Sequence, residues 1–244
     1  MESANIYVQP SRTADWVVHE IKRLILDRGL QSGDPVPSEV DLASMLGISR
    51  SSVREAIKVL STLDIVQVQH GKGTFVSNMS LEPMVQSLIF RGALTPNGGL
   101  MALRDAVEIR AQLDSAYAHA VTTALHDHPD EKLRDIVYQM EVMAKKGKPF
   151  LELDREYHKE ISRKAKNLLL SQLIDAFWDI EEAMHSKLRK LSTDELIKLA
   201  QQHRDIIEAA EAGDIASYRA LMSAHYAPLL DTLPRTPELD MATA

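Results

Sequence analysis

The sequence predicts a mainly α-helical protein with two domains, a small N-terminal one closed by a β-hairpin and a larger all-α antiparallel helical bundle. Residues 37–76 contain two short amphipathic segments, followed by apolar and polar residues in alternation. From residue 79 onward apolar residues recur at the helical spacing, and glycine and proline cluster at a few breaks. The two patterns meet at a short polar joint, residues 77–80. We therefore expect domains at residues 1–78 and 79–244, the second with six or seven helices.

A serine stands before each of two short helices in the first domain. Ser38 can cap the first helix, with Asp41 in the partner position of a capping box, and Gly47 ends that helix. Ser49 can cap the second helix. Apolar residues recur every three or four positions on both helices, which predicts one buried side on each. These residues are Leu42, Met45 and Leu46 on the first helix, and Val53, Ala56, Ile57, Leu60 and Leu63 on the second.

The second helix is charged on the side opposite to its apolar residues. That side consists of Arg50, Ser51, Arg54 and Lys58. Arginine can bond bidentately to the O6 and N7 atoms of guanine, and serine hydroxyls and the amides of a helix N-terminus bind phosphate oxygens. A solvated surface is the alternative interpretation of one such helix taken by itself.

A hairpin follows the charged helix. Val66 and Val68 alternate with glutamines, and the turn His70-Gly71-Lys72 leads into a return strand. A basic tip of this kind can reach a minor groove or the phosphates beside it. Two helices, the second of them charged, and a basic-tipped hairpin in this order are typical of a winged helix-turn-helix domain, so the sequence predicts DNA binding.

A series of short motifs runs through residues 12–78: Pro37 to Glu39, Leu42 and Ala43, Leu46 to Arg50, Val53 to Ala56, and Gly71 to Val76. They resemble the motifs of the N-terminal domain of GntR-superfamily transcription regulators, with Ile48 in place of a valine. Val40 stands where many FadR-like members of that superfamily carry an arginine. The resemblance implies DNA contacts from the recognition helix and from the wing, made by Arg50, Ser51, Ser52 and Arg54 and by His70 and Gly71.

Composition points to a cytoplasmic protein. The 244 residues include no cysteine, which excludes disulfides, thiolate metal sites and cysteine nucleophiles. No run approaches the ~18 apolar residues of a membrane span, and the N-terminal residues contain no signal-peptide h-region.

The net charge of −7 is carried mainly by the second domain. Residues 1–78 contain 8 basic and 9 acidic side chains, whereas residues 79–244 contain 20 and 26. Residues 50–72 carry four basic side chains against two acidic ones, so the positive field is local. We expect modest non-specific affinity for DNA and reliance on two half-sites bound together.

Four residues of the second domain could converge on a metal ion. Asp154 and His158 are four positions apart, so on a helix they share one face about one turn apart. His203 and His225 occur in or beside apolar stripes on two later segments, which favours an inward direction for both. Spacing by itself leaves open the alternative that each histidine is a hydrogen-bonded core residue.

Further motifs extend across the second domain: Glu108 to Arg110, Asp154 to His158, Lys166 to Leu170, His203 to Ile206, Ala212 to Asp214, and Met222 to His225. They resemble the C-terminal ligand-sensing domain of the FadR-like branch, the all-helical FCD type, with Tyr157 in place of phenylalanine and Lys166 in place of glycine. The resemblance implies a divalent ion bound by Asp154, His158, His203 and His225. One carboxylate and three imidazoles suit Zn²⁺ best, with Ni²⁺ or Mn²⁺ as alternatives, and open positions could take water or an effector carboxylate.

Arg110 and Asn167 are the candidates for effector binding. A guanidinium inside a helical domain needs an anionic partner, which favours contact between Arg110 and a small carboxylate. A salt bridge from Arg110 to Glu108, to Asp114 or to a neighbouring helix is the alternative. Asn167 is more typical of a helix cap, with a pocket role as the second possibility.

These features favour a regulator that is not an enzyme. The expected protein is a homodimer that binds double-stranded DNA at a palindromic operator, represses transcription there and responds to a small carboxylate metabolite beside the metal. A metal-dependent hydrolase is one alternative, although no nucleophile elbow, phosphate loop or HExxH motif occurs. The second alternative is a regulator whose metal is structural or is itself the signal, with no organic effector.

Overall fold

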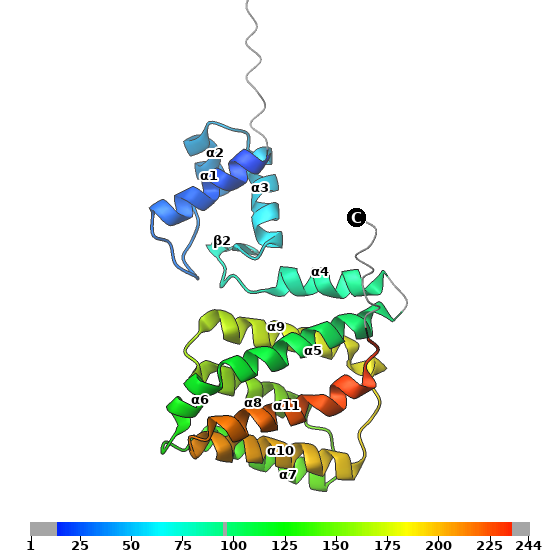
Figure 1. The fold of residues 1–244 in the computed structure, drawn as a ribbon. Helices are drawn as coiled ribbons and strands as arrows, with labels where there is room; N and C mark the ends of the chain where they lie inside the picture. Colours follow the sequence, from blue (N-terminus) through cyan, green and yellow to red (C-terminus); the bar gives the residue numbers. More distant parts are fainter. Residues whose placement is uncertain (1–13, 95–96, 236–244) are drawn as a thin grey trace, which may run out of the picture. The chain divides into compact units, whose positions relative to one another are not determined.

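The computed structural model describes residues 14–94 and 97–235. These residues form two compact units that divide between Pro83 and Met84 (Figure 1). The expected fold class is confirmed, because a winged helix-turn-helix is followed by a unit built of helices. None of the described helices is long and apolar enough to cross a lipid bilayer.

The first unit packs its helices and its hairpin around one apolar core. Its elements are α1 (Ala14–Asp27), α2 (Glu39–Leu46), α3 (Arg50–Thr62), β1 (Val66–Gln69) and β2 (Gly73–Val76). The strands are antiparallel, with Val66 opposite Val76 and Gln69 opposite Gly73. All three helices and both strands contribute residues to this core. Its fully buried members include Val17, Ile21, Leu42, Val53, Ala56, Leu60 and Val66.

The predicted ends of α2 and α3 are confirmed. The Ser38 side chain accepts a hydrogen bond from the Asp41 amide, and Ser49 does the same for Ser52. Gly47 ends α2 with a φ of 65°, in the left-handed region that favours glycine. Each cap satisfies amides or carbonyls that the helix itself cannot pair, so short-range signals locate these ends.

Two residues predicted to be buried, Met45 and Leu63, lie at the surface instead, and so does Val68 of the hairpin. Met45 is 50% exposed because the eight-residue α2 buries only Leu42 and Ala43. Leu63 is 46% exposed at the C-cap of α3, where the chain leaves the helix. Val68 is 48% exposed because it lies two residue pairs nearer the hairpin tip than Val66, the buried residue of β1. The helical and strand periods therefore predict burial correctly in the middle of these elements and incorrectly near their ends.

A short extended segment before α2 pairs with the hairpin, which the sequence did not indicate. Pro35 forms an isolated bridge with Phe75, and the backbone amides of Gly33 and Val36 donate to carbonyl oxygens of β2 at 2.8 Å. These bonds occupy the edge of β2 that would otherwise be unpaired. They tie the wing to the segment that leads into α2.

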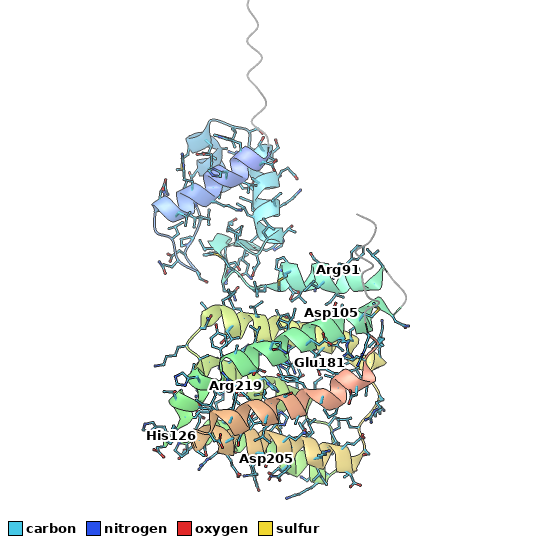
Figure 2. All side chains as sticks on the ribbon, viewed as in Figure 1. Arg91, Asp105, His126, Glu181, Asp205 and Arg219 are labelled. Atoms are coloured by element: carbon cyan, nitrogen blue, oxygen red, sulfur yellow. The ribbon has the colours of Figure 1, made fainter. Side chains whose placement is uncertain are left out.

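The second unit is a bundle whose side chains fill the space between the helices (Figure 2). It contains α4 (Glu82–Ala93), α5 (Gly98–Ala116), α6 (Ala118–Leu125), α7 (Glu131–Lys145), α8 (Leu151–Lys164), α9 (Leu168–Met184), the short 3-10 helix η1 (His185–Lys187), α10 (Thr193–Glu211) and α11 (Ile215–Thr232). In the described part of the chain this makes eight α-helices, one more than the upper expectation. The additional break separates α5 from α6 at Tyr117, where neither glycine nor proline marks it.

The helices that matter for the site are neighbours in the bundle. α10 packs against α7 and α11, α8 against α7 and α9, and α5 against α9 and α11. Side chains from α8, α10 and α11 can therefore meet in the interior, and α5 and α9 enclose that interior from the other side.

Candidate functional site

The charged side of α3 is exposed, as the sequence predicts. Arg50, Ser51, Arg54 and Lys58 are exposed, and Ser52 is half-buried. The Ser49 hydroxyl lies 2.8 Å from that of Ser51 and 2.9 Å from that of Ser52. Three hydroxyls thus gather at the N-terminus of α3, the end whose free amides and dipole favour a phosphate.

Arg54 is not a free cation on this surface. Its Nε and Nη2 atoms lie 3.3 and 2.9 Å from the two carboxylate oxygens of Glu39 on α2. The hydrogen bond with Arg54 lowers the pKa of Glu39 below its usual value. Sequence inspection missed this partner because it lies on the preceding helix.

The tip of the wing is exposed. His70, Gly71 and Lys72 are all exposed, and the Lys72 amide donates to the Gln69 carbonyl to close the turn. Gly71 and Gly73 have φ values of 75° and 121°, which residues with a side chain rarely adopt. The turn therefore projects one imidazole and one ammonium away from the unit.

The four predicted metal ligands meet in the interior of the second unit. Asp154 and His158 come from α8, His203 from α10 and His225 from α11. One ligand atom from each lies within 4.8 Å of all the others. His203 Nε2 is 2.9 Å from Asp154 Oδ1, and His158 Nε2 is 3.2 Å from His225 Nε2. The three histidines are buried and the Asp154 side chain is 14% exposed.

The hydrogen bonds around this cluster suit a cation. His203 Nδ1 donates a hydrogen bond to the Leu199 carbonyl at 2.8 Å, which in the neutral imidazole leaves the Nε2 lone pair directed at the cluster. His158 Nε2 and His225 Nε2 face each other in a buried space, where two lone pairs repel unless a proton or a metal ion lies between them. Among the described residues, His225 Nδ1 has no hydrogen-bond partner. The donor set fits a divalent transition metal.

The pKa values of His225 and Asp154 are both lowered in the cluster. Burial first, and then the neighbouring His203 and His158, hold the pKa of His225 well below its ordinary value. Burial by itself would raise the pKa of Asp154, but His203 and His158 lower it well below the usual range. An ionised carboxylate beside a neutral imidazole is the protonation state that binds a metal ion.

Arg110 is buried next to the cluster, and its anionic partner is Glu181 on the neighbouring helix α9. Its Nη1 atom lies 3.1 Å from Glu181 Oε2, and its guanidinium lies over the Trp178 ring at 4.4 Å from the centroid. Glu108 instead pairs with Arg104 at 2.8 Å. Burial, the largest influence, raises the pKa of Glu181. The neighbouring-helix alternative for Arg110 is thus realised in the structure.

Asn167 acts as the cap of α9. Its Oδ1 atom accepts from the Leu170 amide at 3.1 Å, and its Nδ2 atom donates to the Tyr117 hydroxyl at 2.8 Å. Both ends of the amide are therefore engaged in holding the start of the helix. Trp178 and Phe177 are buried.

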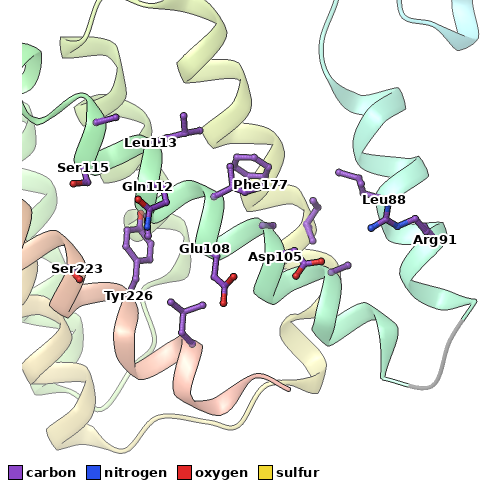
Figure 3. A pocket seen from close by; sticks show the side chains of 17 residues that line it. Leu88, Arg91, Asp105, Glu108, Gln112, Leu113, Ser115, Phe177, Ser223 and Tyr226 are labelled. Carbon is purple, nitrogen blue, oxygen red and sulfur yellow. The ribbon is translucent and has the colours of Figure 1, made fainter. Parts of the chain in front are cut away.

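A groove of about 1080 Å³ lies between α4, α5, α9 and α11 and was not predicted from the sequence (Figure 3). Phe177 and Leu113 contribute apolar walls, and Glu108 and Gln112 contribute polar ones. Tyr226 also lines it, and the hydroxyl of the same side chain lies 3.3 Å from His158 Nδ1. Tyr226 thus connects the groove wall to a metal-ligand candidate.

An exposed winged helix-turn-helix joined to a helical unit with a buried polar centre defines a transcription regulator. Residues 13–76 match the family described as bacterial regulatory proteins, gntR family, and residues 105–228 match the FCD domain. The chain belongs to the GntR family of transcription regulators and carries an FCD effector-binding domain. Its homologues and its fold are those of regulators and not of enzymes.

Relatives match over nearly the whole chain. The "Putative L-lactate dehydrogenase operon regulatory protein" of Escherichia coli K12 is 28% identical over 95% of this chain and 90% of its own length. The HTH-type transcriptional regulator LutR of Bacillus subtilis is 26% identical over 86% of this chain and 96% of its own length. A solved structure, Streptococcus agalactiae GntR, is 25% identical with a TM-score of 0.63 and covers 90% of this chain and 100% of its own.

Proposed function

We propose that this regulator binds a palindromic operator as a homodimer and represses transcription from it. The observation that carries this is the exposed face of α3, where Arg50, Ser51 and Arg54 stand at the end of the helix that favours phosphate. Residues 1–78 carry 8 basic and 9 acidic side chains, and positive charge is in excess only around residues 50–72, so we expect a single unit to bind weakly. Two linked units gain affinity through effective concentration, and a two-fold dimer matches a palindrome. Repression is the simplest consequence, because a bound dimer obstructs polymerase.

We propose that Asp154, His158, His203 and His225 hold a divalent cation, with Zn²⁺ first and Ni²⁺ or Mn²⁺ next. Support comes from four converging donor atoms and from the lone pair that Leu199 leaves on His203 Nε2. When bound, the ion would supply Lewis-acid positions for oxygen ligands. The four residues themselves would supply one carboxylate and three imidazole ligands and leave the remaining positions of the ion open.

The proposed effector is a small organic acid that binds beside the metal. Arg110 would bind the carboxylate of the effector. In the structure Arg110 is paired with Glu181, so the effector carboxylate would replace Glu181 as its partner. A role of Asn167 in binding remains a prediction, since its amide already caps α9. One relative is named for an L-lactate dehydrogenase operon, so 2-hydroxy acids are the first compounds to test. They offer a carboxylate and a hydroxyl to one ion.

The effector would act through differential affinity. A ligand that binds the DNA-competent and DNA-incompetent arrangements equally shifts neither population, whatever its affinity. Loss or gain of operator affinity on addition of the acid therefore measures the coupling directly.

The test is an operator titration with the full-length protein. Promoter fragments containing palindromes are titrated by fluorescence anisotropy, with metal-loaded protein, with chelated protein, and with each acid added. The proposal expects dimer-sized complexes on a palindrome and an acid-dependent change in affinity that needs the metal. Thermal shifts that respond to the ion and to no acid would favour a structural or signalling metal. A transcription assay in which the bound dimer raises output would contradict repression.

A further inference from the structure

The hydroxyl of Tyr226 lies at the centre of a buried chain of hydrogen bonds. Arg110 Nε donates to Tyr226 Oη at 3.0 Å, and Tyr226 Oη lies 2.5 Å from Asp114 Oδ2. His158 Nδ1 lies 3.3 Å from Tyr226 Oη and 3.6 Å from Asp114 Oδ2. All four side chains are at most 3% exposed, so no solvent competes for these contacts.

With His158 neutral, as a metal ligand must be, the donors and acceptors leave one arrangement of protons. Arg110 can only donate, so Tyr226 Oη accepts from it and gives its own proton to Asp114. The oxygens of Tyr226 and Asp114 then face His158 Nδ1 as acceptors. His158 therefore carries its proton on Nδ1, and its Nε2 lone pair is directed at Asp154 and His225.

The three histidines of the cluster differ in how they are held. His203 is oriented by a backbone carbonyl, that of Leu199, which no side-chain substitution removes. Among the described residues, His225 Nδ1 has no partner at all. Of the three, only His158 is contacted at Nδ1 by side chains outside the cluster, and these come from α5 and α11.

We infer that Asp114 and Tyr226 are positioning residues of the metal centre, which set the tautomer and ring orientation of His158. The inference rests on the proposed metal site and adds two residues that do not touch the ion. Partners that orient a ligating histidine typically change metal affinity by about 10- to 100-fold when removed. Neither residue was a site candidate from the sequence.

The helix α11 offers a matched control. Tyr218 lies eight residues before Tyr226 and is equally buried, but its hydroxyl has no hydrogen-bond partner among the described residues. Tyr218→Phe therefore removes a buried hydroxyl from the same helix and leaves the contacts of His158 in place. Tyr226→Phe removes the hydroxyl that contacts both His158 and Asp114, and Asp114→Asn removes one charge and alters the acceptor.

The experiment measures Zn²⁺ affinity of the full chain by competition with a chromogenic chelator, together with the absorption spectrum of the Co²⁺-substituted protein. Circular dichroism of each chelated variant establishes that it is folded. We expect about 10- to 100-fold weaker binding and an altered Co²⁺ spectrum for Tyr226→Phe and Asp114→Asn. Tyr218→Phe should stay within about twofold of the wild type.

Three results would overturn the inference. Wild-type affinity and spectrum in both Tyr226→Phe and Asp114→Asn would remove the positioning role and leave the metal site standing. Equal weakening by Tyr218→Phe and Tyr226→Phe would assign the effect to packing. Failure of the wild-type chain to bind Zn²⁺, Ni²⁺ or Mn²⁺ would end both this inference and the proposed metal site. If Asp114→Asn does not fold, Tyr226→Phe decides.

Discussion

Arg54 on the recognition helix is held at two points by Glu39 at the start of α2, with Nε to Oε1 at 3.3 Å and Nη2 to Oε2 at 2.9 Å. The pair links the two helices of the helix-turn-helix through side chains that are both partly exposed. It limits the directions that the guanidinium can take, while Nη1 remains outside the pair. Glu39 therefore orients the residue that we expect to read a base.

Glu39→Gln should lower the preference for operator over random DNA while raising non-specific affinity. The substitution releases Arg54 and also removes a negative charge beside the duplex. Glu55→Gln is the control, because it removes the same charge without releasing Arg54. Glu55 pairs with Lys58 on α3 at 2.8 Å. Anisotropy titrations with operator and with random DNA give the ratio of the two affinities. An identical change in the two variants would show that charge, and not orientation, is responsible.

Lys72→Ala should weaken binding to operator and random DNA alike. An exposed ammonium at the wing tip neutralises a phosphate, so its loss should reduce the slope of log affinity against log salt by about 1. Titrations at several salt concentrations give the slope. A loss confined to the operator would instead assign a base contact to this side chain.

His203→Ala should lower the metal content of the purified protein and weaken the response to the effector. DNA binding should remain largely intact, because the ligands lie within the second unit. His119→Ala is the control, since His119 is exposed on α6 and is not part of the cluster. Elemental analysis after reconstitution measures the ion. Unchanged metal content in His203→Ala would count against the site.

Glu181→Gln should destabilise the second unit and make it more responsive to carboxylates. Removing one charge of a buried pair leaves Arg110 without its counter-ion, at a cost of roughly 2 to 5 kcal/mol. A bound carboxylate would restore the pairing, so the thermal shift given by a small organic acid should exceed that of the wild type. Glu108→Gln is the control, because Glu108 pairs with Arg104. Equal thermal shifts in Glu181→Gln and Glu108→Gln would show that Arg110 does not bind the effector.

Sequence reasoning succeeded where the physical signal is local. Ser38, Gly47 and Ser49 mark helix ends, because a cap depends on residues three or four positions away. Asp154 and His158 were found because one turn of helix brings them together. Joining them to residues on two later helices needed the resemblance to known regulators.

The partners that act at a distance could not be predicted in this way. Arg54 and Glu39 are 15 residues apart, Arg110 and Glu181 are 71 apart, and Tyr226 and Asp114 are 112 apart. Each pair follows from how helices pack, and a single sequence carries no spacing that reports it. The break at Tyr117 was missed for a related reason, since no glycine or proline marks it.

The most direct test of the DNA-reading role is the affinity of Arg54→Ala for the operator and for random DNA. We expect its operator affinity to fall by about 5- to 150-fold, with a much smaller loss on random DNA, because base contacts carry the specificity. Undiminished operator preference in this variant, in protein that remains folded, would contradict the assignment of α3 as the helix that reads DNA.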